Sequence, residues 1–151
     1  MKTSTKDKSD NIDLILKSTW LAVSKMYSDM ASEYDSTAVQ ALTLLKIDPK
    51  DGTRSTNLGP KMAIEPTSLT RIVKLLEDNG FIYKEKTDVD KREVIIKLTE
   101  KGLQHRDISK DVVLNFNQII IDKIEKEKLD IFREVMSTIL RTANQLNNKK
   151  K

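Results

Sequence analysis

Apolar residues in the first third of the chain recur at steps of three and four, the spacing that places them on one face of a helix. This pattern runs from Ile12 to about Ser32 and predicts a first helix. A second helix is predicted after Thr37, which lies three residues before Gln40 in the spacing of a capping box. That helix is expected to stop near Ile47.

Turn-forming residues then interrupt the helical pattern. Residues 48–53 include a proline and a glycine and predict a loop. Ser55 or Thr56 is expected to cap a short helix that ends near Met62. A Gly-Pro pair lies inside this segment and is expected to shorten the helix, since proline is best tolerated in the first helical turn.

A longer amphipathic helix is predicted after a turn at residues 63–65. Pro66 suits its first position because the fixed φ of proline is already helical, and Gly80 suits a left-handed cap at its end. At 1.5 Å per residue this helix would be about 21 Å long. Its inward face is expected to carry Leu69, Ile72, Val73 and Leu76.

After this helix the pattern changes to period two, which predicts two strands. Residues 81–87 and 94–98 alternate in this way, and residues 88–91, three of them charged, predict a hairpin turn between them. Helical spacing returns from Thr99 and is expected to break near residues 124–125, where the apolar register changes. Both of the resulting helices carry long stripes of Ile, Leu, Val and Phe.

Composition narrows the class of protein. The 151 residues are 38% hydrophobic and 33% charged, which suits one domain with its own core, and the low counts of Gly (4) and Pro (3) favour helices. The absence of Cys excludes disulfides, thiolate metal sites and thiol redox sensing, and the single His105 excludes a multi-histidine metal site. The sequence has no nucleophile–base pair and no phosphate-binding glycine loop, so we expect neither an enzyme nor a cofactor.

Hydropathy indicates where the protein is located, and charge indicates which class of partner it suits. No apolar run reaches the ~18 residues that a membrane span needs, and no apolar segment follows the N-terminal lysines as it does in a secretory signal. The expected location is the cytoplasm. The net charge of +4 suits a polyanionic partner.

Most of the positive charge falls on one segment. Residues 54–74 contain four cations and one anion, a net charge of +3. An α-helix fits the ~12 Å wide major groove of DNA, where hydroxyls and cations reach base edges and phosphates. The alternative is an ordinary surface helix with a solvated polar face, but the turn before it and the hairpin after it favour DNA binding. The predicted DNA contacts in this segment are Arg54, Thr67, Ser68, Thr70, Arg71 and Lys74.

Two motifs then carry a family resemblance. Asp-Lys-Arg at residues 90–92 is followed, at the right distance, by Leu-Thr-Glu-Lys-Gly at residues 98–102. With the capping box of the second helix, the Thr-Arg pair at 70–71 and the order of helices, the chain resembles the MarR family of bacterial transcriptional regulators over residues 12–146. The resemblance implies a mainly α fold with a small β-hairpin wing, a winged helix-turn-helix whose N- and C-terminal helices form a dimerisation domain.

The resemblance also implies a division of the chain. Residues 11–36 and 100–147 would be the dimerisation helices, and residues 37–99 the winged helix-turn-helix lobe that binds DNA. Residues 1–10 are expected to form a flexible arm and residues 148–151 a frayed tail. A C2 homodimer would bury the long apolar stripes of the outer helices, because an isologous interface uses the same patch twice.

The implied function is that of a DNA-binding transcriptional regulator, and repression is the commoner mode in this family. A homodimer would place two recognition helices about 34 Å apart over a pseudo-palindromic operator in double-stranded DNA. In the wing, Lys91 and Arg92 are expected to contact DNA, with Arg92 in the minor groove and Asp90 holding it in place as its family counterpart does. The alternative is that Asp90 and Arg92 form an ion pair within the hairpin and nothing more.

Many members of this family respond to small anionic or phenolic ligands, which implies a small aromatic or anionic effector. By position its pocket would contain Trp20, Tyr27, Met30, Tyr34 and Leu42, although such residues more often belong to a core or an interface. An effector would release DNA by binding better to a dimer whose recognition helices are wrongly spaced. The thiol-based peroxide sensing of some relatives is excluded because Cys is absent, and zinc sensing is disfavoured by the poor ligand set.

Two other functions remain open at this point. A winged-helix regulator of another family, such as one resembling PadR, is disfavoured by the motif at residues 98–102 and by the helix that precedes the reading unit. A winged-helix module for protein–protein contact would bind DNA weakly and without salt dependence. Binding through Lys and Arg instead weakens by about 0.9 log units per tenfold rise in salt for each phosphate neutralised.

Overall fold

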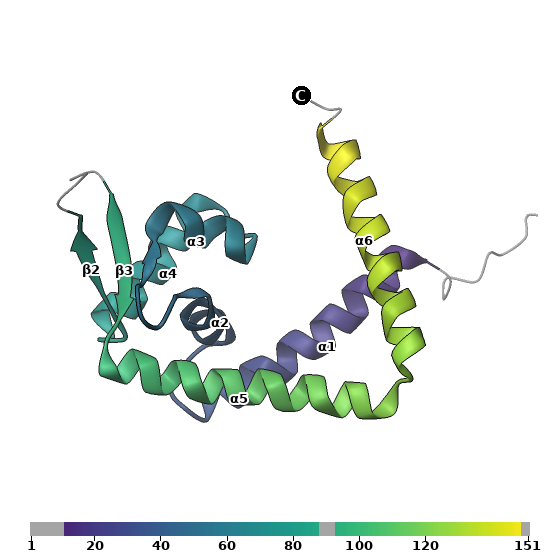
Figure 1. Ribbon diagram of the computed structural model, residues 1–151, viewed down its shortest axis with the longest axis horizontal. Coiled ribbons are helices and arrows are strands. Elements are labelled where there is room, and N and C mark those ends of the chain that lie inside the picture. Colours follow the sequence, from purple (N-terminus) through teal and green to yellow (C-terminus); the bar gives the residue numbers. More distant parts are fainter. Residues whose placement is uncertain (1–10, 88–92, 149–151) are drawn as a thin grey trace, which may run out of the picture. The chain divides into compact units, whose positions relative to one another are not determined.

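The structure is a computed structural model that describes residues 11–87 and 93–148. Its elements confirm the expected fold class, mainly helical with a small antiparallel sheet (Figure 1). The chain divides within the fifth helix into two compact units, one up to Lys110 and one from Asp111, which are described separately. The elements are α1 (Ile12–Ser32), α2 (Ala38–Lys46), β1 (Thr53–Arg54), α3 (Ser55–Met62), α4 (Pro66–Asp78), β2 (Ile82–Lys86), β3 (Val94–Leu98), α5 (Glu100–Lys123) and α6 (Lys126–Asn148).

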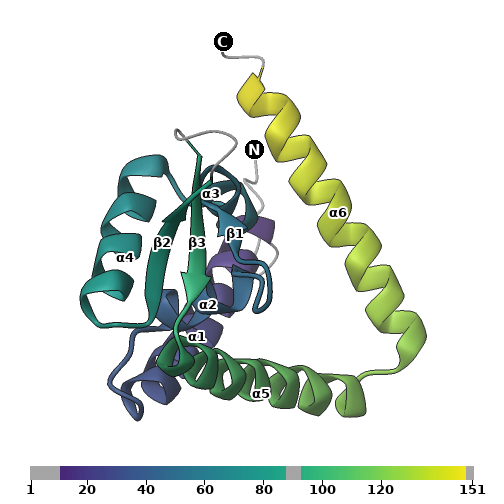
Figure 2. The ribbon, with the colours of Figure 1, turned by 60° about the vertical axis from the view of Figure 1, so that its left-hand side comes forward.

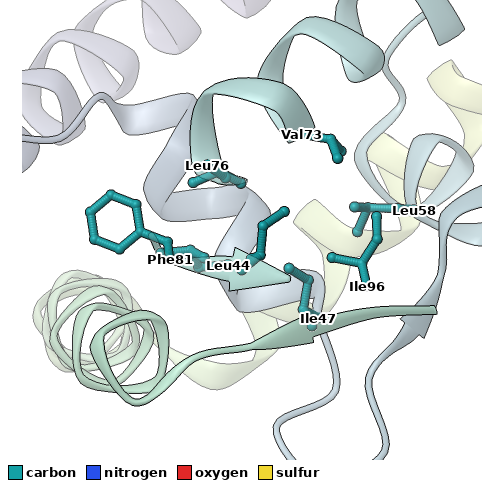
Figure 3. Close-up of a cluster of buried hydrophobic side chains, with 8 residues drawn as sticks. Leu44, Ile47, Leu58, Val73, Leu76, Phe81 and Ile96 are labelled. Atoms are coloured by element: carbon teal, nitrogen blue, oxygen red, sulfur yellow. The ribbon is translucent and has the colours of Figure 1, made fainter. Parts of the chain in front are cut away.

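The core of the first unit lies where α2, α3, α4 and β3 meet (Figure 3). As predicted, α4 packs its apolar face inward: Val73 and Leu76 are buried, and Leu69 and Ile72 pack partly buried against the same cluster. Each fully buried aliphatic side chain contributes about 1.5–3 kcal/mol relative to an exposed one. The buried cluster consists of Leu44, Ile47, Leu58, Val73, Leu76, Phe81, Ile82 and Ile96.

The sheet has three strands in the order β1-β3-β2, all antiparallel (Figure 2). The hairpin of β2 and β3 was predicted, whereas β1 was not. Its two residues pair Thr53 with Ile96 and Arg54 with Ile95. Gly52 precedes β1 with φ +76, and an added Cβ there would lie 2.7 Å from the Ile96 carbonyl oxygen. A two-residue strand has no period of its own, so only its pairing with β3 identifies it.

Local hydrogen bonds explain where the first elements begin. Thr37 and Gln40 form the predicted capping box: the Gln40 N–H donates to Thr37 Oγ1 at 3.2 Å, and the Thr37 N–H donates to Gln40 Oε1 at 3.0 Å. The prediction that Ser55 or Thr56 caps α3 is wrong, because the N-cap is Arg54 and no side chain caps this helix. The start of α3 is set instead by the pairing of β1 with β3.

The expectation that the Gly-Pro pair shortens α3 is wrong. The helix extends through both residues to Met62. Gly59 is buried, and an added Cβ would lie 3.3 Å from the Leu69 side chain of α4. The glycine therefore allows the two helices to approach closely. Pro60 is exposed and lies in a helix of only eight residues.

The first turn of α5 is tied to the turn between α4 and β2. The Thr99 N–H donates to the Phe81 carbonyl at 3.0 Å, and the Thr99 hydroxyl donates to the Gly80 carbonyl at 2.7 Å. The same hydroxyl accepts from the Gly102 N–H at 3.0 Å. An added Cβ on Gly102 would lie 1.8 Å from the Phe81 carbonyl oxygen. These contacts explain why the motif at residues 98–102 requires a threonine and, three residues later, a glycine.

The second unit consists of the end of α5 and all of α6. The predicted break at residues 124–125 is confirmed, since α5 ends at Lys123 and α6 begins at Lys126. The apolar stripe of α6 is exposed. The residues of this stripe that are at least half exposed include Ile131, Phe132, Val135, Leu140 and Leu146. Among the residues that the structure describes, no helix is long and apolar enough to span a membrane.

Candidate nucleic-acid interface

The α3–turn–α4 segment forms a helix-turn-helix. The turn depends on Ala63, which adopts a left-handed conformation with φ 52. The Ile64 N–H donates to the Gly59 carbonyl at 3.2 Å and closes the end of α3. Pro66 then occupies the first turn of α4 as predicted. This geometry confirms the predicted turn at residues 63–65 and fixes the direction in which α4 leaves it.

The outward face of α4 carries hydroxyls and cations. The helix has 13 residues, about 20 Å at 1.5 Å per residue. Because its apolar side faces the core, the polar side faces solvent over its full length. A helix of this length and polarity can enter a major groove and reach base edges. The exposed polar residues are Thr67, Ser68, Thr70, Arg71 and Lys74, all five predicted from the sequence.

Three of these side chains differ in their contacts. The Thr70 hydroxyl donates to the Pro66 carbonyl at 3.0 Å. Lys74 Nζ lies 2.9 Å from the Asp78 carboxylate, and this hydrogen bond raises the pKa of Lys74. Arg71 is exposed and forms no ion pair with any residue of 11–87 or 93–148. Its guanidinium is therefore available for bidentate contacts, which suit guanine and phosphate.

Arg54 is placed beside the base of the wing. The pairing of β1 with β3 brings it near Glu93, and the two side chains form an ion pair at 2.5 Å. Arg54 is more than half exposed, whereas about a quarter of the Glu93 side chain is exposed. The structure therefore brings Arg54 together with the hairpin, which the sequence placed only on the same segment as α4.

The hairpin itself is cross-linked by charge. Lys84 Nζ on β2 lies 2.6 Å from the Glu77 carboxylate of α4, so the wing strand is tied to the recognition helix. Lys97 on β3 lies 3.1 Å from Glu85 on β2, and that hydrogen bond raises the pKa of Lys97. The predicted wing residues Asp90, Lys91 and Arg92 lie outside the described residues.

An open groove runs between α3, α4 and the hairpin. Gly59, Pro60 and Leu69 are among the small and apolar residues that line it. Glu65 also lines it; this residue is exposed at the start of α4 and makes no capping hydrogen bond. The other charged residues that line it are Lys74, Glu77 and Lys84.

The five residues predicted for an effector pocket lie on α1, α2 and the segment between them. Trp20 is 59% exposed and Tyr34 is 44% exposed, whereas Tyr27, Met30 and Leu42 are half-buried. Burial raises the pKa of Tyr27. None of the five lines the groove beside α4.

Sequence reasoning missed three carboxylates that pair with the cations of this surface, Glu77, Asp78 and Glu93. The spacing of Lys74 and Asp78 at i and i+4 was a usable signal. The other two pairs join residues from different elements, and only the folded sheet brings them together. In the described part of the chain, no group of three or more His, Cys, Asp or Glu residues could hold a metal ion.

Comparison with known proteins agrees with this geometry. The MarR family model matches residues 37–94, which span α2 to the start of β3. The chain is 26% identical over 106 residues to the HTH-type transcriptional regulator SarZ of Staphylococcus epidermidis, covering 70% of this chain and 72% of that protein. It is 25% identical over 125 residues to the organic hydroperoxide resistance transcriptional regulator of Bacillus subtilis, covering 83% and 84%.

Solved structures show the same fold. The S. aureus MepR–DNA complex superposes with a TM-score of 0.79 at 16% identity, over 88% of this chain and 98% of that one. The PcaV regulator of Streptomyces coelicolor, in complex with its natural ligand, gives a TM-score of 0.77 at 18% identity, over 91% and 96%. The helix-turn-helix, the hairpin and these likenesses make the chain similar to the MarR family of winged-helix transcriptional regulators, and the family model matches the winged helix-turn-helix itself.

Proposed function

We propose that this protein binds double-stranded DNA by inserting α4 into the major groove, and that it regulates transcription in this way rather than acting as an enzyme. One observation carries the proposal: the face of α4 opposite the core is exposed and carries several hydroxyls and cations. Those groups reach base edges and phosphates. In this proposal Arg71, unpaired within the described residues, makes the main base contact.

The wing would make a second contact. We propose that Arg54 and Lys91 contact phosphates and that Arg92 enters the minor groove, held there by Asp90. A narrow A·T-rich minor groove concentrates negative potential and favours arginine. The proposal for Arg54 is supported by its exposed position beside the base of the hairpin. The MepR structure, solved as a DNA complex, lends support because it shares the fold.

We also propose that the protein acts as a homodimer in the cytoplasm. The helices α1, α5 and α6 carry large apolar side chains that are exposed in the single chain, including Ile15, Leu21, Leu114 and Phe132. Covering them would remove apolar surface from water, at about 25 cal/mol per Å² buried. In this division, residues 11–36 and 100–147 form the dimerisation part and residues 37–99 the DNA-binding lobe. A dimer mass by light scattering at micromolar concentration is expected, and a monomer mass would contradict this.

The mode of regulation is proposed to be repression relieved by a small aromatic or anionic effector. PcaV shares the fold and was solved with its natural ligand. The proposed pocket would contain Trp20, Tyr27, Met30, Tyr34 and Leu42. An effector can shift the dimer away from DNA only if it binds the DNA-incompetent conformation more tightly.

The proposal is tested by capturing genomic DNA fragments with purified protein and with Arg92→Ala in parallel. We expect a sharp set of enriched sites that share a two-fold motif and weaken in the variant. Binding to one such site should also fall steeply with salt, by about 0.9 log units per tenfold salt for each phosphate neutralised. Diffuse enrichment with salt-insensitive binding would contradict the proposal and favour a protein–protein module.

A further inference from the structure

The last turn of α4 contains two neighbouring carboxylates, and each pairs with a lysine, one on α4 itself and one on the wing strand β2. Asp78 lies 2.9 Å from Lys74 one turn earlier on the same helix. Glu77 lies 2.6 Å from Lys84, which belongs to the wing strand β2. Neither pair joins α4 to the core: they neutralise cations on the polar side of the helix and on the hairpin.

Arg71, on the same helix, differs from these two lysines in its contacts. It lies three residues before Lys74, is exposed, and has no ion-pair partner among residues 11–87 and 93–148. The carboxylates of α4 are therefore distributed unevenly. They pair with Lys74 of α4 and with Lys84 of β2, and leave the arginine near the middle of α4 unpaired among the described residues.

This distribution has a consequence for binding. Sequence-independent affinity depends almost entirely on cations that neutralise phosphates, whereas an operator adds contacts to base edges. A lysine that is paired with a carboxylate must leave that carboxylate and contact a phosphate before it contributes to DNA affinity. At an operator, base contacts by α4 keep the phosphates within reach and favour the exchange. At other sequences those contacts are missing, so the ion pairs persist and fewer phosphates are neutralised.

We propose that Glu77 and Asp78 are specificity-determining residues, because they hold Lys84 of the wing and Lys74 of the recognition helix in ion pairs and so keep both cations from phosphates at sequences other than the operator. This inference rests on the proposed function, since it concerns the same surface. The raised pKa of Lys74 agrees with a pair that forms in the free protein. Exposed ion pairs are weak, so each carboxylate should change non-operator affinity by only about two- to fivefold.

The test compares Asp78→Asn with a matched control, Glu65→Gln. Both variants remove one negative charge from α4 or its cap, but Glu65 forms no ion pair within the described residues. Affinity is measured by fluorescence anisotropy, over a salt series, for a captured operator duplex and for a scrambled duplex. Asp78→Asn should raise affinity for the scrambled duplex about two- to fivefold more than the control does. It should also steepen the salt dependence by about 0.9 log units per tenfold salt, with a smaller gain at the operator.

A second pair of variants separates release of the lysine from simple loss of negative charge. In a Lys74→Met background, Asp78→Asn should have no more effect than Glu65→Gln, because the cation that it would release is gone. Glu77→Gln is expected to act through Lys84 and should keep its full effect in that background. Thermal unfolding of each variant checks that the fold is retained.

The outcomes also distinguish this inference from the proposed function. If the wild-type protein binds its operator and loses affinity with Arg71→Ala, but Asp78→Asn matches Glu65→Gln on both duplexes, the inference alone is overturned. The same holds if the gain of Asp78→Asn survives in the Lys74→Met background. If the wild-type protein binds no operator, the proposed function fails and the inference fails with it.

Discussion

Replacing Gly102 by alanine should destabilise the protein strongly, although alanine is normally the better helix former. The new Cβ would lie 1.8 Å from the Phe81 carbonyl oxygen and 2.9 Å from its carbonyl carbon. Both are backbone atoms, so no side chain can rotate away. Relief requires α5 to move from the turn before β2, which would break the bonds of Thr99 to Phe81 and to Gly80.

The size of the effect follows from three contributions. Overpacking costs about 1–3 kcal/mol, and losing two hydrogen bonds costs about 1 kcal/mol each. Alanine returns at most about 1 kcal/mol of helix propensity. We therefore expect Gly102→Ala to lower the free energy of unfolding by about 2–4 kcal/mol.

Urea denaturation followed by circular dichroism measures this change, with Gly80→Ala as the control. Gly80 has φ +72, but an added Cβ meets nothing within 4 Å. Its replacement should cost only the left-handed backbone penalty, about 1–2 kcal/mol. A Gly102→Ala protein as stable as the wild type would refute the reasoning, because α5 would then not rest against the Phe81 carbonyl.

Three further predictions concern stability. Leu44→Ala removes a side chain that is 1% exposed and should lower the free energy of unfolding by about 2–5 kcal/mol. If urea denaturation shows a loss below about 1 kcal/mol, Leu44 does not lie in the core. Thr37→Ala removes half of the capping box with Gln40 and should cost about 1 kcal/mol, seen as a lower Tm; an unchanged Tm would show that α2 does not depend on this cap. Burial, and secondarily the charge of Lys101, lowers the pKa of His105 in the folded protein, so the unfolded chain binds more protons near pH 6.5. Stability should be full above about pH 6.5 and fall below it, and His105→Gln should remove that part of the pH dependence; equal slopes for both proteins in urea titrations at several pH values would contradict this.

The predictions from sequence succeeded where a local pattern determines the structure. Steps of three and four set α1, the Thr37–Gln40 spacing set the start of α2, and Pro66 set the start of α4. The break between α5 and α6 followed from a change of apolar register at residues 124–125. In each case the residues that decide the element lie within one or two helical turns of it.

They failed where a distant part of the chain decides. The start of α3 depends on β1 pairing with β3, more than 40 residues later in the chain, and so the expected serine or threonine cap was wrong. The Gly-Pro pair at positions 59–60 was expected to shorten α3, but the helix continues through it, and the close approach of Leu69 explains the glycine. The candidate site followed the same rule. The polar face of α4 was readable from its period, but the Arg54–Glu93 pair required the folded sheet.

The central claim is that α4 reads DNA, and Arg71 tests it most directly. The measurement is the affinity of Arg71→Met for a captured operator duplex, compared with that of Arg133→Met. Arg133 is an exposed arginine of α6 that pairs with Asp130, so its replacement removes the same charge from another element. The account predicts that Arg71→Met loses roughly 1–3 kcal/mol of operator binding, about five- to 150-fold, while Arg133→Met stays close to the wild type. Equal affinities for the two variants would contradict the claim that α4 is the recognition helix.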